Sequence, residues 1–158
     1  MEAPLCKERT VIPMNIEFTV PGPPQGKARA RTFYNQRAGH MSSVTPEKTV
    51  LYENLVKTRY LESMERQMLP YQTLEGPLTV HISAYYEPPK STSKKNYAKM
   101  IADDIFPTKK PDIDNIAKVI LDALNGIAYK DDTQVVNLIV IKRYSKETYV
   151  LVKIERVE

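Results

Sequence analysis

Two pairs of aspartates, each beside lysines, could carry out chemistry in this sequence. Asp112 and Asp114 stand in the segment KKPDIDNIAK, and Asp131 and Asp132 follow in YKDDTQV. Carboxylates that a fold brings together repel one another unless a cation neutralises them, and such oxygen ligands favour Mg²⁺ or Mn²⁺. A divalent metal site is therefore one interpretation of the four aspartates.

A structural interpretation competes with the metal site. Asp112 is a suitable helix cap, and Asp114 falls in the first helical turn, where the macrodipole favours negative charge. Lys118 follows Asp114 by one turn, so the two can form an exposed ion pair of the kind that contributes little to stability. Capping explains one aspartate of the first pair better than both, and the spacing alone leaves the two interpretations open.

The elements that would position the aspartates are a helix and a strand. The helix is predicted from about Asp112 to Asn125, because apolar residues recur there with helical spacing. These apolar residues are Ile113, Ile116, Ala117, Ile120, Ala123 and Leu124. The second acidic pair precedes QVVNLIVIKRY, an almost continuous apolar run that predicts a central strand.

The remaining elements complete an α+β fold. Period-two alternation predicts strands in MNIEFTV, PLTVHISAYYE and TYVLVKIERV, and helical spacing predicts a helix capped by Thr45 and ending near Met68. A short basic helix is predicted in PPKSTSKKNYAKM. The expected order is β-α-β-(α)-α-β-β, a two-layer domain with a mixed sheet of about four strands packed by helices. A single domain is expected from residue 14 to 158, after a flexible segment over residues 1–13.

Positive charge is concentrated in a few segments. The formal charge of the chain is only +4, yet no acidic residue occurs from Phe18 to Pro46. The basic residues that could neutralise DNA phosphates beside an acidic site are Lys27, Arg29, Arg31, Lys94, Lys95, Lys109 and Lys110. The alternative is that the basic run in PGPPQGKARAR is only a solvated loop.

Composition excludes several other classes of protein. With 158 residues and 42% apolar composition the chain suits one globular domain. Its single cysteine, Cys6, provides neither an intrachain disulfide nor a cysteine metal cluster. The longest apolar run is too short to span a membrane, and no signal peptide is recognisable. A cytoplasmic location without membrane association is therefore expected.

The segment from Lys109 to Val135 resembles the RusA family of Holliday-junction resolvases (crossover junction endodeoxyribonucleases). That family has a DxDN-x-x-K helix followed by a DDxQV element, and PGPPQGKARAR resembles its Pro-rich, basic opening. The resemblance runs from about Ile16 to Glu155 and is weakest from Gly39 to Lys109. It implies a Mg²⁺-dependent endonuclease, found largely in phages and prophages, that acts on four-way junctions in DNA recombination and repair.

The resemblance also implies roles for individual residues. Asp112, Asp114 and Asp132 would be metal ligands, for Mg²⁺ or Mn²⁺, with Lys118 as a catalytic lysine and Asp131 as a supporting acid. If DDTQV is extended, Asp131 and Asp132 face opposite ways, so only one of them can point directly into the site, and Asp132 is chosen as that residue. The resemblance further implies a homodimer, which fits a junction with two-fold symmetry that needs two matched cuts.

Other functions fit the sequence less well. A dehalogenase-type phosphatase also uses a DxD pair, but at the end of an apolar strand, whereas IFPTKKPDID supplies polar residues and prolines. A glycosyltransferase is disfavoured because no nucleotide-binding unit with glycine-rich turns is present. The main alternative is a non-catalytic nucleic-acid-binding module, for which the basic segments and tyrosines would suffice. A pure binder, however, gains nothing from four aspartates near its DNA surface.

Overall fold

The main sheet has four strands in the order β1-β6-β4-β5, in a computed structural model that describes residues 15–157. β1 (Asn15–Pro21) pairs antiparallel with β6 (Tyr149–Arg156), and β6 pairs antiparallel with β4 (Leu78–Tyr86). β5 (Val135–Tyr144) runs parallel to β4. The predicted α+β fold with a mixed four-stranded sheet is confirmed, whereas the predicted flexible segment 1–13 lies outside the described residues.

β5 is an edge strand, so the prediction of a central strand is wrong. Among the described residues only β4 pairs with it in the sheet, and Val136, Leu138 and Ile139 remain 58%, 43% and 48% exposed. An unbroken apolar run indicates a strand that is covered on both faces. Within the described chain that cover is incomplete, which leaves an apolar sheet edge open to solvent.

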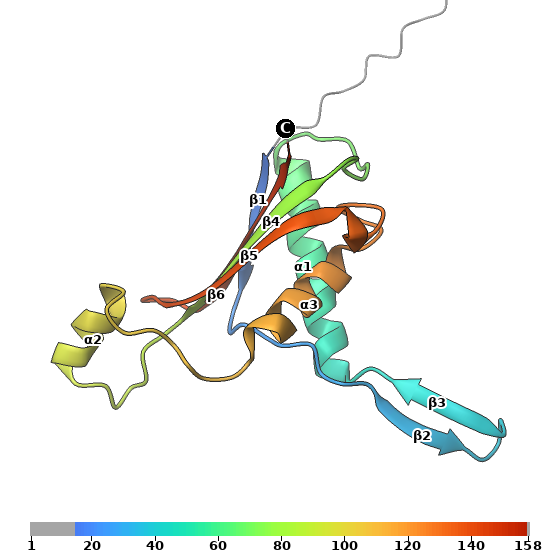
Figure 1. Cartoon of the computed structure of the whole chain (residues 1–158), viewed down its shortest axis with the longest axis horizontal. Helices are drawn as coiled ribbons and strands as arrows, with labels where there is room; N and C mark the ends of the chain where they lie inside the picture. The colour runs from blue at the N-terminus through green and yellow to red at the C-terminus, as the bar shows by residue number, and fades with distance from the viewer. Residues whose placement is uncertain (1–14, 158) are drawn as a thin grey trace, which may run out of the picture.

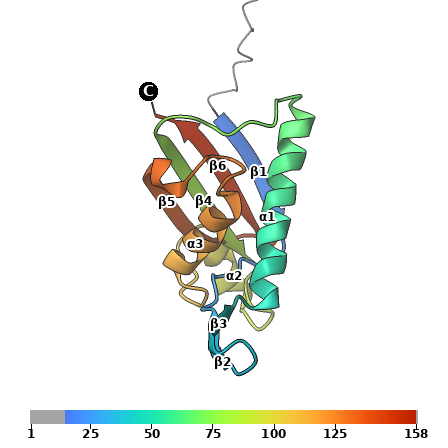
Figure 2. The same ribbon diagram turned by 90° about the vertical axis from the view of Figure 1, so that its right-hand side faces the viewer.

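Two helices cover one face of the sheet, α1 (Glu47–Arg66) and α3 (Ile113–Leu124), as Figure 2 shows. α3 agrees with its predicted limits to within about one residue, although Ile113 at its start is exposed. α1 begins after Pro46, and no side chain caps it, so the predicted Thr45 cap is wrong. The core lies between these helices and the alternating apolar side chains of β1, β4 and β6.

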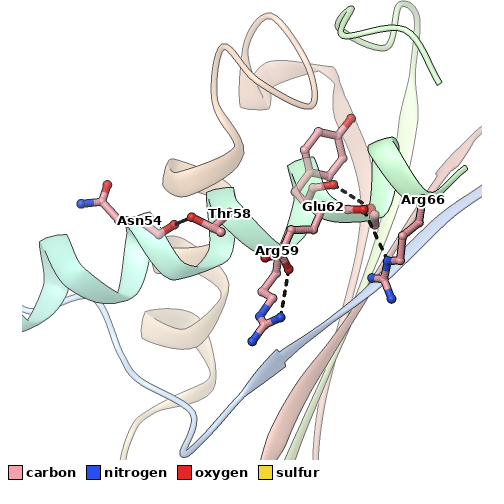
Figure 3. Close-up of polar contacts among 7 residues, drawn as sticks. Asn54, Thr58, Arg59, Glu62 and Arg66 are labelled. Carbon is pink, nitrogen blue, oxygen red and sulfur yellow. Dashed lines mark hydrogen bonds and ion pairs between the residues drawn. The ribbon is translucent and has the colours of Figure 1, made fainter. Parts of the chain in front are cut away.

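The accessible side of α1 carries polar contacts along the helix (Figure 3). The Thr58 hydroxyl donates to the Asn54 carbonyl at 2.9 Å, and Arg59 pairs with Glu62 at the same distance. Arg66 donates to the Glu62 carbonyl at 3.4 Å. These are local contacts within α1.

A two-stranded hairpin and a short helix project from this core (Figure 1). β2 (Arg31–Asn35) and β3 (His40–Val44) pair antiparallel in a second sheet that was not predicted. The predicted basic helix is present as α2 (Lys94–Ile101), capped by the Ser93 hydroxyl, which accepts from the Asn96 amide. No helix of the described chain is long and apolar enough to cross a membrane.

Candidate active site

Asp112 and Asp114 lie at the start of α3 with exposed carboxylates. Asp112 occupies the N-cap position, but its side chain accepts no capping hydrogen bond, contrary to the capping role that was predicted. Asp114 lies in the first turn, and its carboxylate oxygen is 3.4 Å from the Lys118 ammonium. Both members of that pair are more than 60% exposed, so the contact adds little stability. Both carboxylates are therefore free to bind a cation.

Lys142 of β5 holds the loop that leads into α3. Its ammonium donates to the carbonyl of Lys109 and, at 3.1 Å, to the carbonyl of Pro111, the residue before Asp112. The ammonium also lies 5.6 Å from the centre of the Tyr86 ring, on which Lys109 packs at 5.0 Å. Burial lowers the pKa of Lys142, while the nearby Asp112 carboxylate acts in the opposite direction. The charged lysine thus fixes the backbone from which Asp112 projects.

A second segment, residues 22–30, passes over the first turn of α3 and is called the strap below. The Lys27 amide donates to the Asn115 carbonyl at 2.9 Å. A Cβ atom on Gly26 would come within 2.8 Å of the Pro111 Cβ atom, so the strap and the α3 start are in close contact. The strap therefore ties the chain before β2 to the two aspartates.

The Lys27 side chain is engaged within the protein. Its ammonium pairs with Glu53 of α1 and, at 3.0 Å, with Asp122 of α3. Burial alone would lower the pKa of Lys27, but the two carboxylates raise it above the ordinary value. Of the predicted DNA-binding residues, Lys27 thus has its charge largely balanced and acts as an anchor for the strap.

The second acidic pair forms a short turn at the start of β5. The 3-10 turn η1 spans Asp132–Gln134, so the backbone is extended at Asp131 but not at Asp132, and the extended pair assumed in choosing between the two aspartates is not observed. Asp131 accepts a hydrogen bond from the Thr133 hydroxyl at 2.9 Å. Gln134 donates to the carbonyls of Leu74 and Gly76 and thereby fixes the turn. Asp132 as a direct ligand and Asp131 as a supporting acid stay predictions.

The two acidic pairs lie at different ends of α3. Burial raises the pKa of Asp132, and the Asp131 and Asp122 carboxylates raise it further. Asp122 lies two turns beyond Asp114, roughly 12 Å along the helix axis. Among residues 15–157, no three His, Cys, Asp or Glu side chains form a group that could hold a metal ion. Asp112, Asp114 and Asp132 are thus not grouped in the described chain, and their roles as metal ligands stay predictions.

The other predicted DNA-binding residues remain exposed. Lys94 and Lys95 begin α2, Lys109 and Lys110 precede Asp112, and the arginines 29 and 31 lie at the end of the strap and the start of β2. Lys109 and Lys110 directly precede the α3 start, and Arg29 belongs to the strap that contacts it. Their charge is available to flanking phosphates.

Comparison with known proteins identifies the class to which this domain belongs. Residues 21–155 match the family Endodeoxyribonuclease RusA. The chain is also 37% identical to the uncharacterized protein YqaN of Bacillus subtilis (strain 168) over 144 residues, which is 90% of this chain and 96% of that protein. The protein therefore belongs to the RusA family of endodeoxyribonucleases, the Holliday-junction resolvases that its motifs resemble.

Sequence reasoning missed Lys142 and Gln134, although both left a signal. Lys142 has the same parity along β5 as Leu138 and Val140, which pair with core residues of β4. A lysine at a core-facing position of an apolar strand indicates a buried or half-buried charge with a specific partner. Gln134 belongs to the DDTQV motif, but its role as the anchor of that turn depends on residues 74–76, which are distant in sequence.

Proposed function

We propose that the protein is a divalent-metal-dependent endodeoxyribonuclease that resolves four-way DNA junctions in recombination and repair. The observation that carries this proposal is the free carboxylate pair Asp112 and Asp114 at the start of α3, in a chain of the RusA family. The family supplies the reaction class, and the bacterial relative supports a bacterial, phage or prophage origin. The metal requirement, the dimer and the residue roles are our proposals.

The donor set at the α3 start suits Mg²⁺ or Mn²⁺. Mg²⁺ in phosphoryl-transfer sites is commonly held by one or two carboxylates together with waters and substrate phosphate oxygens. Asp112 and Asp114 provide two such carboxylates, neither of which is used for helix capping. When bound there, the cation would lower the pKa of a water molecule and offset charge on the scissile phosphate.

The protein side chains contribute positioning and charge. Asp112 and Asp114 would bind the cation from a backbone that Lys142 fixes in place. The exposed Lys118 ammonium, one turn along α3, would leave Asp114 and bind a phosphate oxygen as negative charge develops there. Lys109 and Lys110, with the exposed basic residues of the strap and α2, would bind phosphates on either side of the cut.

A two-fold dimer would complete the acidic site. β5 begins at Val135, just after the turn that contains Asp132, and Lys142 near its other end contacts the Asp112 loop. If the β5 edges of two copies pair antiparallel, the start of one strand lies beside the end of the other. Asp132 of each copy would then approach Asp112 and Asp114 of the other copy. The exposed apolar side chains Val136, Leu138 and Ile139 of β5 support this edge as the interface.

Such a dimer also suits the substrate. A four-way junction has approximate two-fold symmetry, and its resolution needs two matched cuts. A dimer with two identical sites related by a two-fold axis would present one site to each of the opposing strands. Each site would use residues of both copies, so a free monomer would be unable to cut.

Substitution of the carboxylate pair tests the proposed function. Asp112→Asn and Asp114→Asn should each reduce Mg²⁺-dependent cleavage of a synthetic four-way junction by at least about 100-fold, because ligand charge is lost without loss of volume. Junction binding should be retained or become tighter, since negative charge near DNA is removed. Asp104→Asn is the matched control, because Asp104 is an exposed aspartate outside the proposed ligand set.

Near-normal turnover of either variant at saturating Mg²⁺ would rule out the proposed ligands. If the unmodified protein binds junctions but does not cut them with Mg²⁺ or Mn²⁺, the result favours a non-catalytic binding module instead. This second candidate is retained because no three-carboxylate group occurs within the described part of a single chain.

A further inference from the structure

The β2–β3 hairpin, residues 31–44 and called the arm below, projects from the domain without forming part of the main sheet (Figure 1). Eight of its ten strand residues are exposed, and the other two, Asn35 and Ser42, are half-buried. A two-stranded hairpin is at best marginally stable in water by itself. Contact with a binding partner would therefore stabilise the arm.

The arm exposes large apolar side chains on both faces. Phe33 and Val44 belong to one face and are 48% and 53% exposed, while Tyr34 and Met41 belong to the other and are 60% and 61% exposed. A flat protein surface could cover only one of these faces. A ribbon that is apolar on both faces fits best between two surfaces, such as the stacked bases on either side of an opened DNA branch point.

The charge of the arm favours DNA over a second protein surface. Arg31 and Arg37 belong to the arm, Arg29 precedes it, and no Asp or Glu occurs between Phe18 and Pro46. Aromatic side chains on which bases stack, flanked by basic residues that bind phosphates, are the usual combination for binding unpaired nucleotides. Base stacking needs no particular sequence, which suits recognition of DNA shape.

The position of the arm relates it to the candidate active site. The strap leads directly into β2 and is held against the first turn of α3 by the Lys27 amide and Gly26. Five strand residues extend about 17 Å at roughly 3.3 Å each. That length corresponds to about five base-pair steps of duplex. An arm that begins beside the cleavage site can thus reach a branch point several base pairs away.

We propose that the arm enters the branch point of a DNA junction and stacks Phe33 and Tyr34 on unpaired bases there. The arm would thereby give the enzyme its preference for branched over linear DNA. This role rests on the proposed nuclease function, because it assumes that a junction is bound at the α3 start.

Photo-crosslinking and binding measurements test the arm. In metal-free buffer with a chelator, a junction that carries 5-iodouracil at the branch point should crosslink to Phe33 or Tyr34, as mapped by mass spectrometry. The same label placed in the middle of a duplex arm should not crosslink to these residues. Phe33→Leu/Tyr34→Leu keeps apolar side chains but removes both rings, and it should weaken junction binding by about 5- to 150-fold per stacked base. Binding to linear duplex should change little.

Tyr71→Ala is the control, because Tyr71 is an exposed tyrosine beyond the far end of α1. A double variant that keeps the crosslink at the branch point, or keeps the junction preference, would overturn the proposal. Dissociation of a dimer by the double variant in sedimentation velocity would also overturn it, because the arm would then contact a second copy. If the unmodified protein cuts junctions but the expected crosslink or the loss of junction binding is not observed, only the arm proposal is lost. If the unmodified protein cuts no junction, the nuclease function fails first.

Discussion

At the scale of single residues, the candidate site depends on one lysine that the motif does not contain. Lys142 donates to the carbonyls of Lys109 and Pro111 and lies over the Tyr86 ring. Asp112 follows Pro111 directly, so the position of the Asp112 carboxylate depends on the backbone that Lys142 contacts. A misplacement of about 1 Å in a catalytic site can reduce the rate by a factor of about 100. Lys142 is therefore a positioning residue of the site.

Lys142→Met should lower cleavage by about 10- to 100-fold and shift the Mg²⁺ dependence of cleavage to higher concentrations, because the Asp112 loop loses its donor. A Mg²⁺ titration of junction cleavage measures both effects, and Mn²⁺ binding followed by electron paramagnetic resonance measures affinity without turnover. Lys146→Met, at an exposed lysine in the turn after β5, is the matched control. An unchanged metal dependence for Lys142→Met would remove this residue from the site.

At the scale of elements, the strap joins three parts of the molecule. It connects β1 to the arm, contacts the α3 start through Gly26, and reaches α1 and α3 through the Lys27 ammonium. These contacts fix where the arm begins relative to Asp112. The strap is thus the element through which packing in the core determines the position of the proposed DNA-binding arm.

Gly26→Ala should lower the free energy of unfolding by about 1–3 kcal/mol, because the added methyl group overlaps Pro111 and Asn115. Urea denaturation followed by circular dichroism gives the value. Ala28→Ser adds an atom at an exposed position of the same strap and should have a small effect. Equal stability of Gly26→Ala and the unmodified protein would show that the contact between strap and helix is looser than described.

The elements differ in how far the sequence predicts them. α3 was predicted to about one residue at each end, because an apolar stripe is a local signal. The place of β5 in the sheet was not predictable in this way, since an unbroken apolar run fits a central strand and also an edge that another chain covers. The two strands of the arm are short and follow a proline-rich segment, and their pairing depends on a turn rather than on burial. The distance in space between the two acidic pairs depends on the tertiary structure, so it cannot be inferred from their spacing in the sequence.

At the scale of the whole molecule, the exposed edge of β5 and the separated acidic pairs have one common explanation. A dimer formed through β5 would cover Val136, Leu138 and Ile139 and bring the second acidic pair of one copy to the first pair of the other. Without a partner, the apolar edge remains a site for uncontrolled strand pairing. The dimer would therefore serve both solubility and catalysis.

Ile139→Lys should convert the dimer to monomers and abolish junction cleavage together, because a charge is placed in the apolar interface. Sedimentation velocity and a cleavage assay measure the two effects, and the circular dichroism spectrum should be unchanged. Met68→Lys is the control, since Met68 is 93% exposed and lies outside β5. A monomeric Ile139→Lys protein that still cuts would show that each chain holds a complete site.

Mixed dimers test the central claim, a nuclease site shared between two copies, most directly. Each of the variants Asp112→Asn and Asp132→Asn is expected to be inactive by itself. The two variant proteins are mixed, unfolded and refolded together, so that dimers with one chain of each kind form. If each site takes Asp112 from one copy and Asp132 from the other, a mixed dimer contains one site with both aspartates intact. Half of randomly formed dimers are mixed, so nicking of a four-way junction should return to about one quarter of the unmodified level, as single rather than paired cuts. A mixture that stays inactive, while the unmodified protein treated in the same way cuts normally, would contradict the shared site.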